Sequence, residues 1–176
     1  MAPVEELAFT AQGLHLREWR VSDVEQMSRL FDTEEMNRWT PLPHPFTVEV
    51  ATAYGRQARQ RAGGVLQLAI CQTADGSPVG EVLLFPAADA GTVELAYAVG
   101  AEHRGQRIGA RAITAALELA VLSGATRAVL TIAEDNPASQ ATARAAGFGK
   151  MDAPLRRRER KGFVLMMETW ERSLAR

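Results

Sequence analysis

The sequence predicts a mixed α/β fold in a single domain that spans residues 1–176. Segments with the two-residue period of strands are interleaved with segments of helical period, and their order is not a simple strand–helix repeat. Three consecutive strand-like segments in the middle of the chain indicate an antiparallel run. The chain of 176 residues is long enough to bury a core, and its 47 % hydrophobic residues are ordinary for a globular protein.

The first third of the chain predicts one strand and two helices. The strand falls within residues 13–20, and Ser22 begins the first helix through a capping box with Glu25. Residues 38–46 contain three prolines and are predicted to form a loop. Thr47 is predicted to cap the second helix, which runs to about residue 61.

The middle of the chain predicts strands over residues 65–71, 79–85 and 92–99. In the last of these, apolar and aromatic side chains alternate onto one face: Val93, Leu95, Tyr97 and Val99. The other face carries one acid and two small residues: Glu94, Ala96 and Ala98. This second face leaves room for a molecule to lie against the sheet.

The last third predicts helix, strand, helix and strand. An apolar stripe over residues 113–121 indicates the first of these helices, and residues 127–132 the strand that follows. Asn136 at a cap position and Pro137 at the first helical position predict the next helix, which Gly147 ends.

The charge of the chain argues against a general nucleic-acid-binding function. The formal net charge is −1, whereas such proteins usually carry a basic excess. The basic run at residues 156–162 is predicted to be a solvated turn before a last strand over residues 163–170.

Other features of composition favour a soluble protein of the cytoplasm. The chain has no apolar run long enough to span a membrane, and residues 1–9 carry acids where a signal peptide would carry basic residues. The single cysteine, Cys71, cannot form an internal disulfide and is predicted to be a small core residue. The three histidines and one cysteine lack ligand spacing, so no metal site is predicted.

Residues 101–110 suggest a site for an anion at the start of a helix. Gly105 and Gly109 let backbone amides approach a ligand closely, and Arg104 and Arg107 add positive charge. A tight turn with solvated arginines is the alternative interpretation. The glycine spacing is that of neither a P-loop nor a dinucleotide fingerprint.

Several short motifs, taken in order, resemble the GNAT superfamily of N-acetyltransferases. The segment Arg104-Gly105-Gln106-Arg107-Ile108-Gly109 is similar to its phosphate motif, and Asn136-Pro137-Ala138-Ser139 with Gly147-Phe148 is similar to its second conserved helix. The early segments LREWRVSD and LPHPFT are similar to the branch named for the RimJ and RimL acetyltransferases. The family has a glycine where this chain has Arg107; a side chain is tolerated there in a helix-like conformation but strained at positive φ.

The resemblance implies a fold with a central mixed, mostly antiparallel sheet, flanked by helices and containing a splayed pair of parallel strands. It implies acetyl-CoA as cosubstrate, with its pyrophosphate against the loop and its pantetheine arm along the strand over residues 92–99. The residues that it assigns to acetyl-CoA are Ala98, Val99, Arg104, Gly105, Gln106, Arg107, Ile108, Gly109, Ala110, Asn136 and Ser139. It also implies that the amide of Val99 or a neighbour polarises the thioester carbonyl, and that Ser139 assists the departing thiolate.

Transfer to an amine requires a proton acceptor, because an amine attacks only in its neutral form. Glu94 is the first candidate, since it lies on the strand face with the two alanines, and Glu81 is the second. The alternative for Glu94 is an exposed residue in a cross-strand ion pair. Trp39 beside the proline-rich loop either forms a wall of the acceptor pocket or covers the core.

The hypothesis that accounts for most of these features is an N-acetyltransferase that transfers the acetyl group directly to a primary amine. The acceptor is either a protein N-terminus or a small molecule. An acyl-CoA-binding module without catalysis, and a protein-interaction surface with no cofactor, are the alternatives. The resemblance also implies a homodimer as one expected assembly.

Overall fold

A nine-stranded sheet organises residues 6–174, the part of the chain described in this computed structural model. The strand order is β1-β2-β3-β4-β5-β6-β9-β7, with β8 paired to β9. The strands are β1 (Ala8–Ala11), β2 (Leu14–Glu18), β3 (Leu66–Cys71), β4 (Pro78–Pro86), β5 (Thr92–Val99), β6 (Arg127–Ala133), β7 (Gly149–Lys150), β8 (Arg156–Arg160) and β9 (Phe163–Ser173). Every pairing is antiparallel except β5 with β6, which confirms the predicted mixed sheet.

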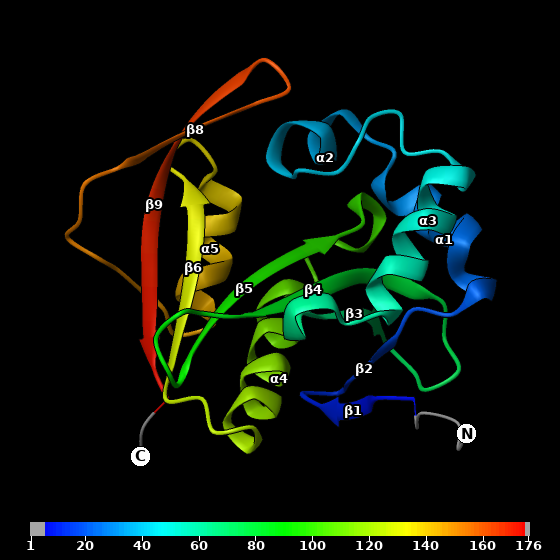
Figure 1. The fold of residues 1–176 in the computed structure, drawn as a ribbon, viewed down its shortest axis with the longest axis horizontal. Coiled ribbons are helices and arrows are strands. Elements are labelled where there is room, and N and C mark those ends of the chain that lie inside the picture. The colour runs from blue at the N-terminus through cyan, green and yellow to red at the C-terminus, as the bar shows by residue number, and fades with distance from the viewer. Residues whose placement is uncertain (1–5, 175–176) are drawn as a thin grey trace.

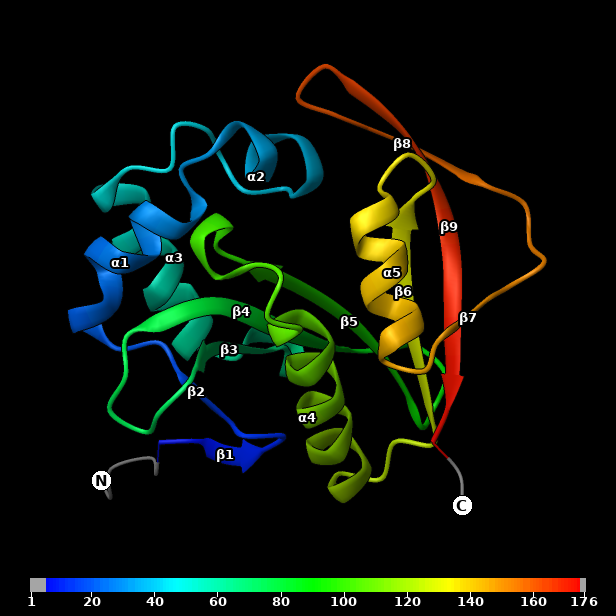
Figure 2. The ribbon, with the colours of Figure 1, turned by 180° about the vertical axis from the view of Figure 1, so that it is seen from behind.

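Helices cover both faces of the sheet. They are α1 (Val24–Phe31), α2 (Glu34–Trp39), α3 (Val48–Arg59), α4 (Ile108–Leu122) and α5 (Pro137–Ala145). The first three form one buried cluster with Ala69, Cys71 and Ala98, and α4 and α5 belong to a larger cluster on the opposite face. Figure 1 shows α1 and α3 near β2, β3 and β4, whereas α5 lies beside β6 and β9. Figure 2 shows α4 and α5 from the opposite side.

The parallel strands β5 and β6 separate partway along their length. Their pairing runs from Thr92 opposite Arg127 to Leu95 opposite Leu130 and then stops. Strand β5 continues to Val99 paired with β4 alone, and β6 continues to its end paired with β9. Figure 1 shows the two strands diverging from a common end. The predicted splay is therefore confirmed.

The cap of the first helical segment differs from the prediction. Asp23, and not Ser22, satisfies the backbone here: its Oδ2 accepts a hydrogen bond of 2.8 Å from the amide of Arg20. The same carboxylate receives two hydrogen bonds, of 2.7 and 3.1 Å, from the buried guanidinium of Arg17. A buried guanidinium needs a partner, so the burial of Arg17 favours Asp23 as the capping side chain.

Four short elements were not predicted from the sequence: β1, α2, β7 and β8. Thr33 caps α2, since its Oγ1 accepts a hydrogen bond of 3.1 Å from the amide of Met36. Strand β8 replaces most of the predicted solvated turn, because residues 156–160 of the basic run pair with β9 and only Lys161 and Gly162 form a turn. A sequence of mostly arginines has no strand periodicity of its own, so the partner strand determines this structure.

Two further predictions concern single features. Cys71 is fully buried and burial raises the pKa of its thiol, which confirms it as a core residue. None of the helices within residues 6–174 combines the length and hydropathy that a membrane crossing requires. The predicted absence of a signal peptide concerns residues 1–9, and residues 1–5 lie outside the described part.

Candidate active site

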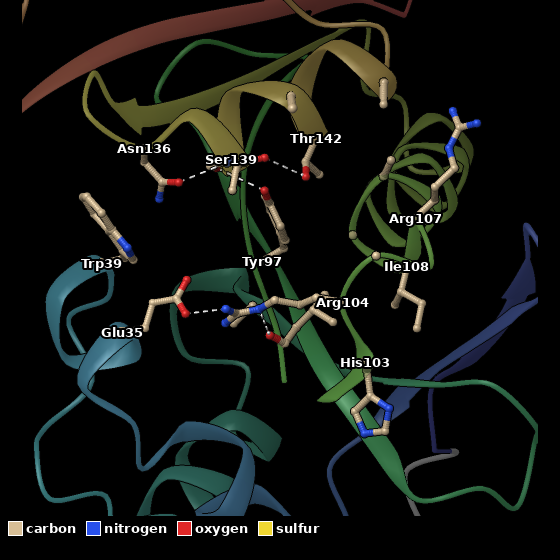
Figure 3. Close-up of a pocket in the computed structure, with 18 of the residues that line it drawn as sticks. Glu35, Trp39, Tyr97, His103, Arg104, Arg107, Ile108, Asn136, Ser139 and Thr142 are labelled. Atoms are coloured by element: carbon tan, nitrogen blue, oxygen red, sulfur yellow. Dashed lines mark hydrogen bonds and ion pairs between the residues drawn. The ribbon is translucent and has the colours of Figure 1, made fainter. Parts of the chain in front are cut away.

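Two cavities adjoin at the gap between β5 and β6. The helix-side cavity, about 390 Å³, lies at the N-termini of α4 and α5 (Figure 3). The sheet-side cavity, about 590 Å³, lies over β4, β5, β6 and the β8–β9 hairpin. Residues that line both cavities are Trp39, Thr40, Tyr97, Ala98, Asn136 and Ser139. Two molecules that enter from opposite sides can therefore meet at this gap.

The N-terminus of α4 presents a set of unpaired amides to the helix-side cavity. Within residues 6–174, none of the amides of residues 105–110 donates a hydrogen bond to the backbone or to a side chain. In α2, α3 and α5, by contrast, a side chain caps the first turn. Exposed amides and the helix dipole attract an anion. This end of α4 is therefore suited to a phosphate group.

Arg107 adopts the left-handed conformation just before α4, with φ 58° and ψ 17°. Of the two conformations considered for this motif position, the structure has the one that favours glycine. A side chain in this region costs about 1 kcal/mol relative to glycine. Arg107 thus places a cation beside the helix end at a cost in backbone energy.

Gly109 lines the helix-side cavity close to Tyr97 of β5 and Thr142 of α5. A Cβ atom on this residue would lie 3.1 Å from the ring of Tyr97 and 3.2 Å from the methyl group of Thr142. Both distances are tighter than ordinary van der Waals contact. Gly109 therefore keeps space open between α4, β5 and α5.

The edge of β5 offers backbone groups to the gap. The amide of Gly100 donates a hydrogen bond of 2.9 Å to the carbonyl of Val79 on β4. Because backbone groups alternate sides along a strand, the amides and carbonyls of Tyr97 and Val99 face the gap. Ala98 has its backbone groups on the β4 side, so its contribution to the two cavities is its small side chain.

Arg104 extends across the gap and not toward the end of α4. Its Nε donates a hydrogen bond of 3.2 Å to the carbonyl of Val99, and its guanidinium forms an ion pair with Glu35 of α2. Figure 3 shows the side chains of Arg104 and Arg107 pointing in opposite directions. A ligand amide can pair with the Val99 carbonyl only after Arg104 turns away.

At the first turn of α5, the hydroxyl group of Ser139 lies beside that of Tyr97 on β5. Asn136 caps the helix as predicted, since its Oδ1 accepts a hydrogen bond of 3.1 Å from the amide of Ser139. The Oγ of Ser139 lies 3.1 Å from the hydroxyl of Tyr97 (Figure 3). Burial raises the pKa of Tyr97, so its phenol stays protonated at neutral pH. This pair can donate a proton or a hydrogen bond inside the gap.

Glu81 lies at the floor of the sheet-side cavity and is 2 % exposed. Its Oε1 accepts a hydrogen bond of 2.9 Å from the hydroxyl of Tyr54, and its Oε2 has no hydrogen-bond partner among the described residues. Burial raises its pKa to about 7, against the opposing effects of Tyr54 and Trp19. A carboxyl group with this pKa can accept a proton at neutral pH.

Glu94 also lines the sheet-side cavity, as predicted from its position on the same strand face as Ala96 and Ala98. It is paired in register with Val129, in the part of β5 that is still joined to β6. Its Oε1 accepts a hydrogen bond of 3.0 Å from the hydroxyl of Thr131. Glu81, by contrast, is opposite Ala98, which borders both cavities. Of the two carboxylates, Glu81 lies closer in register to the gap.

The structure brings together most of the predicted site residues and adds one. All residues assigned to acetyl-CoA line the helix-side cavity except Gln106. Tyr97 was interpreted only as part of the apolar face of its strand, yet its hydroxyl contacts Ser139. A phenol among aliphatic residues on one face is the signal that could have identified it.

Comparison with known proteins identifies the family. Residues 13–149 match the sequence model described as the acetyltransferase (GNAT) domain. A search of curated protein sequences gives no match.

Solved structures of similar fold include acetyltransferases with different names. Mycobacterium smegmatis RimJ, solved with CoA-disulfide, has a TM-score of 0.79 and 19 % identity over 96 % of this chain and 87 % of its own. The microcin C7 self-immunity acetyltransferase MccE, solved with acetyl-CoA and AMP, has a TM-score of 0.78 and 20 % identity over 92 % of both chains. Spermidine N-acetyltransferase from Vibrio cholerae, solved with CoA and spermine, has a TM-score of 0.74 and 15 % identity over 93 % of this chain and 96 % of its own.

Proposed function

The chain belongs to the GNAT family of acetyltransferases, which use acetyl-CoA, and we propose that it transfers the acetyl group directly to a primary amine with Glu81 as the general base. The observation that carries the proposal is the junction of the two cavities at the gap in the sheet, with a buried carboxyl group of raised pKa opposite Ala98. The acetyl donor enters from the helix side and the amine from the sheet side.

The residues of the helix-side cavity fit acetyl-CoA. Its diphosphate suits the unpaired amides of residues 105–110, with Arg107 beside them. Its pantetheine arm suits the free edge of β5 at Tyr97 and Val99, once Arg104 has turned from the Val99 carbonyl. When bound, acetyl-CoA supplies an activated acetyl thioester. The amide of Val99 can donate a hydrogen bond to an oxygen that gains negative charge in the gap.

Glu81 has the properties that a general base needs. A protonated α-amine has a pKa near 8, so removal of its proton is required at neutral pH. A base is most effective when its pKa lies near the working pH, and that of Glu81 is about 7. Its buried Oε2 has no hydrogen bond from the described residues that would have to break before this oxygen took a proton. In this proposal Glu94, the first candidate from the sequence, holds the acceptor and does not act as the base.

Ser139 and Tyr97 are suited to assist the leaving thiolate. Their hydroxyls are 3.1 Å apart beside the gap, and one can orient the other. A thiol has a pKa near 8.5, so its departure is favoured by a proton or a hydrogen bond.

The two hydroxyls are expected to act as one unit. Tyr97→Phe and Ser139→Ala should each lower kcat by roughly 10²-fold, the low end of what an acid group contributes. The double variant should lose little more than the more severe single variant, because each change already breaks the pair. Steady-state kinetics with one amine at saturating acetyl-CoA measures this. Losses that multiply in the double variant would contradict a shared role.

Arg107→Gly is expected to have opposite effects on stability and on binding. It should raise the free energy of unfolding by about 1 kcal/mol, because glycine adopts the left-handed conformation without strain. It should weaken acetyl-CoA binding severalfold, because one cation beside the diphosphate is lost. Denaturant unfolding and calorimetric titration measure the two quantities separately. Unchanged affinity would assign the diphosphate to the amides alone.

The proposed function is tested by an acceptor screen. Thiol release from acetyl-CoA is followed over a panel of peptides, amino acids and polyamines, and mass spectrometry identifies the acetylated product. Turnover with an N-acetylated product supports the proposal. Tight CoA binding without turnover on any amine would instead identify an acyl-CoA-binding module, and absence of heat on titration with CoA would exclude both. A homodimer and a cytoplasmic location stay predictions from the sequence.

A further inference from the structure

The sheet-side cavity is lined by acids on the sheet and by arginines on the β8–β9 hairpin. The acids Glu81 and Glu94 stand on β4 and β5, and Glu81 is at the buried floor. Two arginines, Arg158 and Arg160, stand on β8, which pairs with β9. Arg158 is opposite Leu165 on β9, whereas the pairing of β9 with β6 ends at Met167. The arginines therefore lie beyond the end of β6, at the outer side of the cavity.

The alternation of side chains along β8 separates its arginines into two groups. Arg158 and Arg160 line the sheet-side cavity. Arg157, the neighbour of Arg158, points to the other face and forms an ion pair of 2.7 Å with Glu159. The exposed guanidinium of Arg158 forms no ion pair or hydrogen bond within residues 6–174. One exposed arginine at the cavity is thus available to a ligand, and its neighbour on the opposite face is not.

The β8–β9 hairpin is held over the cavity by contacts with the loop after α2. Arg160 donates a hydrogen bond of 2.8 Å to the carbonyl of Trp39, and the Nζ of Lys161 donates one of 2.8 Å to the carbonyl of Leu42. Figure 1 shows the tip of the hairpin extending toward α2. The Nε of Arg160 is buried without a partner. These contacts fix the position of the basic side of the cavity relative to its acidic floor.

The wall between the acids and the arginines is largely apolar. The side chains that form it are Trp39, Leu83, Phe85, Leu165 and Met167. A molecule that fits this cavity has a cationic end, an apolar middle and an anionic end. A polyamine satisfies the acids but brings further positive charge toward the arginines, which like-charge repulsion disfavours.

We propose that the acceptor is a primary amine that also carries a carboxylate, with the amine at Glu81 and the carboxylate at Arg158. The inference rests on the proposed acetyltransferase function and names its substrate class. A free amino-acid-like molecule and the acidic N-terminal segment of a peptide present the same chemistry to the cavity. Arginine binds a carboxylate through paired charge-assisted hydrogen bonds, and a neutral amide cannot replace that interaction.

The test compares acceptors that differ only in this one group. One arm uses amino carboxylates and their carboxamides, with an apolar spacer of varied length. The other arm uses peptides with Glu, Gln or Lys at the second or third residue. The protein is expected to prefer the carboxylate over its neutral counterpart by about tenfold in kcat/KM, mainly through KM, and less at high salt. The arm that shows this preference identifies the source of the acceptor.

Variants of β8 test which arginine is responsible for the preference for carboxylate acceptors. Arg158→Gln should abolish the preference, and Arg158→Glu should reverse it toward acceptors with a second cation. Arg157→Gln is the matched control on the opposite face and should keep it. Equal turnover of the carboxylate and neutral acceptors in both arms would overturn the inference and leave the acetyltransferase function standing. Absence of turnover on every amine, with CoA still bound, would overturn both.

Discussion

Glu81→Gln is expected to lower kcat for amine acetylation by about 10²- to 10⁴-fold at neutral pH, the contribution of a general base. Glutamine keeps an oxygen that can accept the hydrogen bond from Tyr54 but cannot take the proton. Binding of acetyl-CoA should be unchanged, because Glu81 is not among the residues of the helix-side cavity. Steady-state kinetics and calorimetric titration with acetyl-CoA measure the two effects.

The dependence on pH distinguishes a base from a structural residue. Glu81 accepts a proton only when ionised, so the activity of the native chain should fall as pH decreases through about 7. Glu81→Gln should lack this step. A larger loss in Glu94→Gln than in Glu81→Gln, with the step removed only in the former, would move the base to Glu94.

Stability should change in the opposite direction to activity. The pKa of Glu81 is raised in the folded chain, so its contribution to stability is present below about 4.5, the ordinary value for the carboxyl group, and is lost as pH rises through about 7. Glutamine does not titrate. Glu81→Gln should therefore gain in Tm relative to the native chain between pH 5 and pH 8. A variant that is inactive but more stable at pH 8 excludes misfolding as the cause of its lost activity.

Gly109→Val is expected to weaken acetyl-CoA binding by roughly 5- to 150-fold, which corresponds to the 1–3 kcal/mol typical of overpacking. The added side chain meets Tyr97 and Thr142, which line the helix-side cavity with Gly109. Either Tyr97 moves away from Ser139 or the cavity is filled. Calorimetric titration measures the affinity, and kcat at saturating acetyl-CoA reports any displacement of Tyr97.

The matched control for this change is Gly149→Val in β7. A Cβ on Gly149 has no atom within 4 Å, and the residue is exposed and outside both cavities. It should leave affinity and kcat unchanged. Affinity that is also unchanged in Gly109→Val would mean that acetyl-CoA does not lie between α4 and α5.

Much of the site could be predicted because its signals are local. Asn136 caps α5, and Gly105 and Gly109 flank the start of α4, because capping and close backbone approach depend on residues within a few positions. The two faces of β5 follow from simple alternation. The cap at Asp23 and the strand β8 could not be predicted in this way, because each depends on packing: the burial of Arg17 in one case and the pairing with β9 in the other.

The sequence by itself determined the order of the longer elements, the glycine- and arginine-containing start of α4, the polar start of α5 and the presence of two candidate carboxylates in neighbouring strands. Only the tertiary structure distinguishes the surroundings of Glu81 from those of Glu94, and the proposal for the base depends on that difference. The pKa of a carboxyl group depends on how much water reaches it, and Glu81 is desolvated at the floor of a cavity, where Tyr54 of α3 is its hydrogen-bond partner. Desolvation is a property of the surroundings in space, and neighbours in the chain do not reveal it.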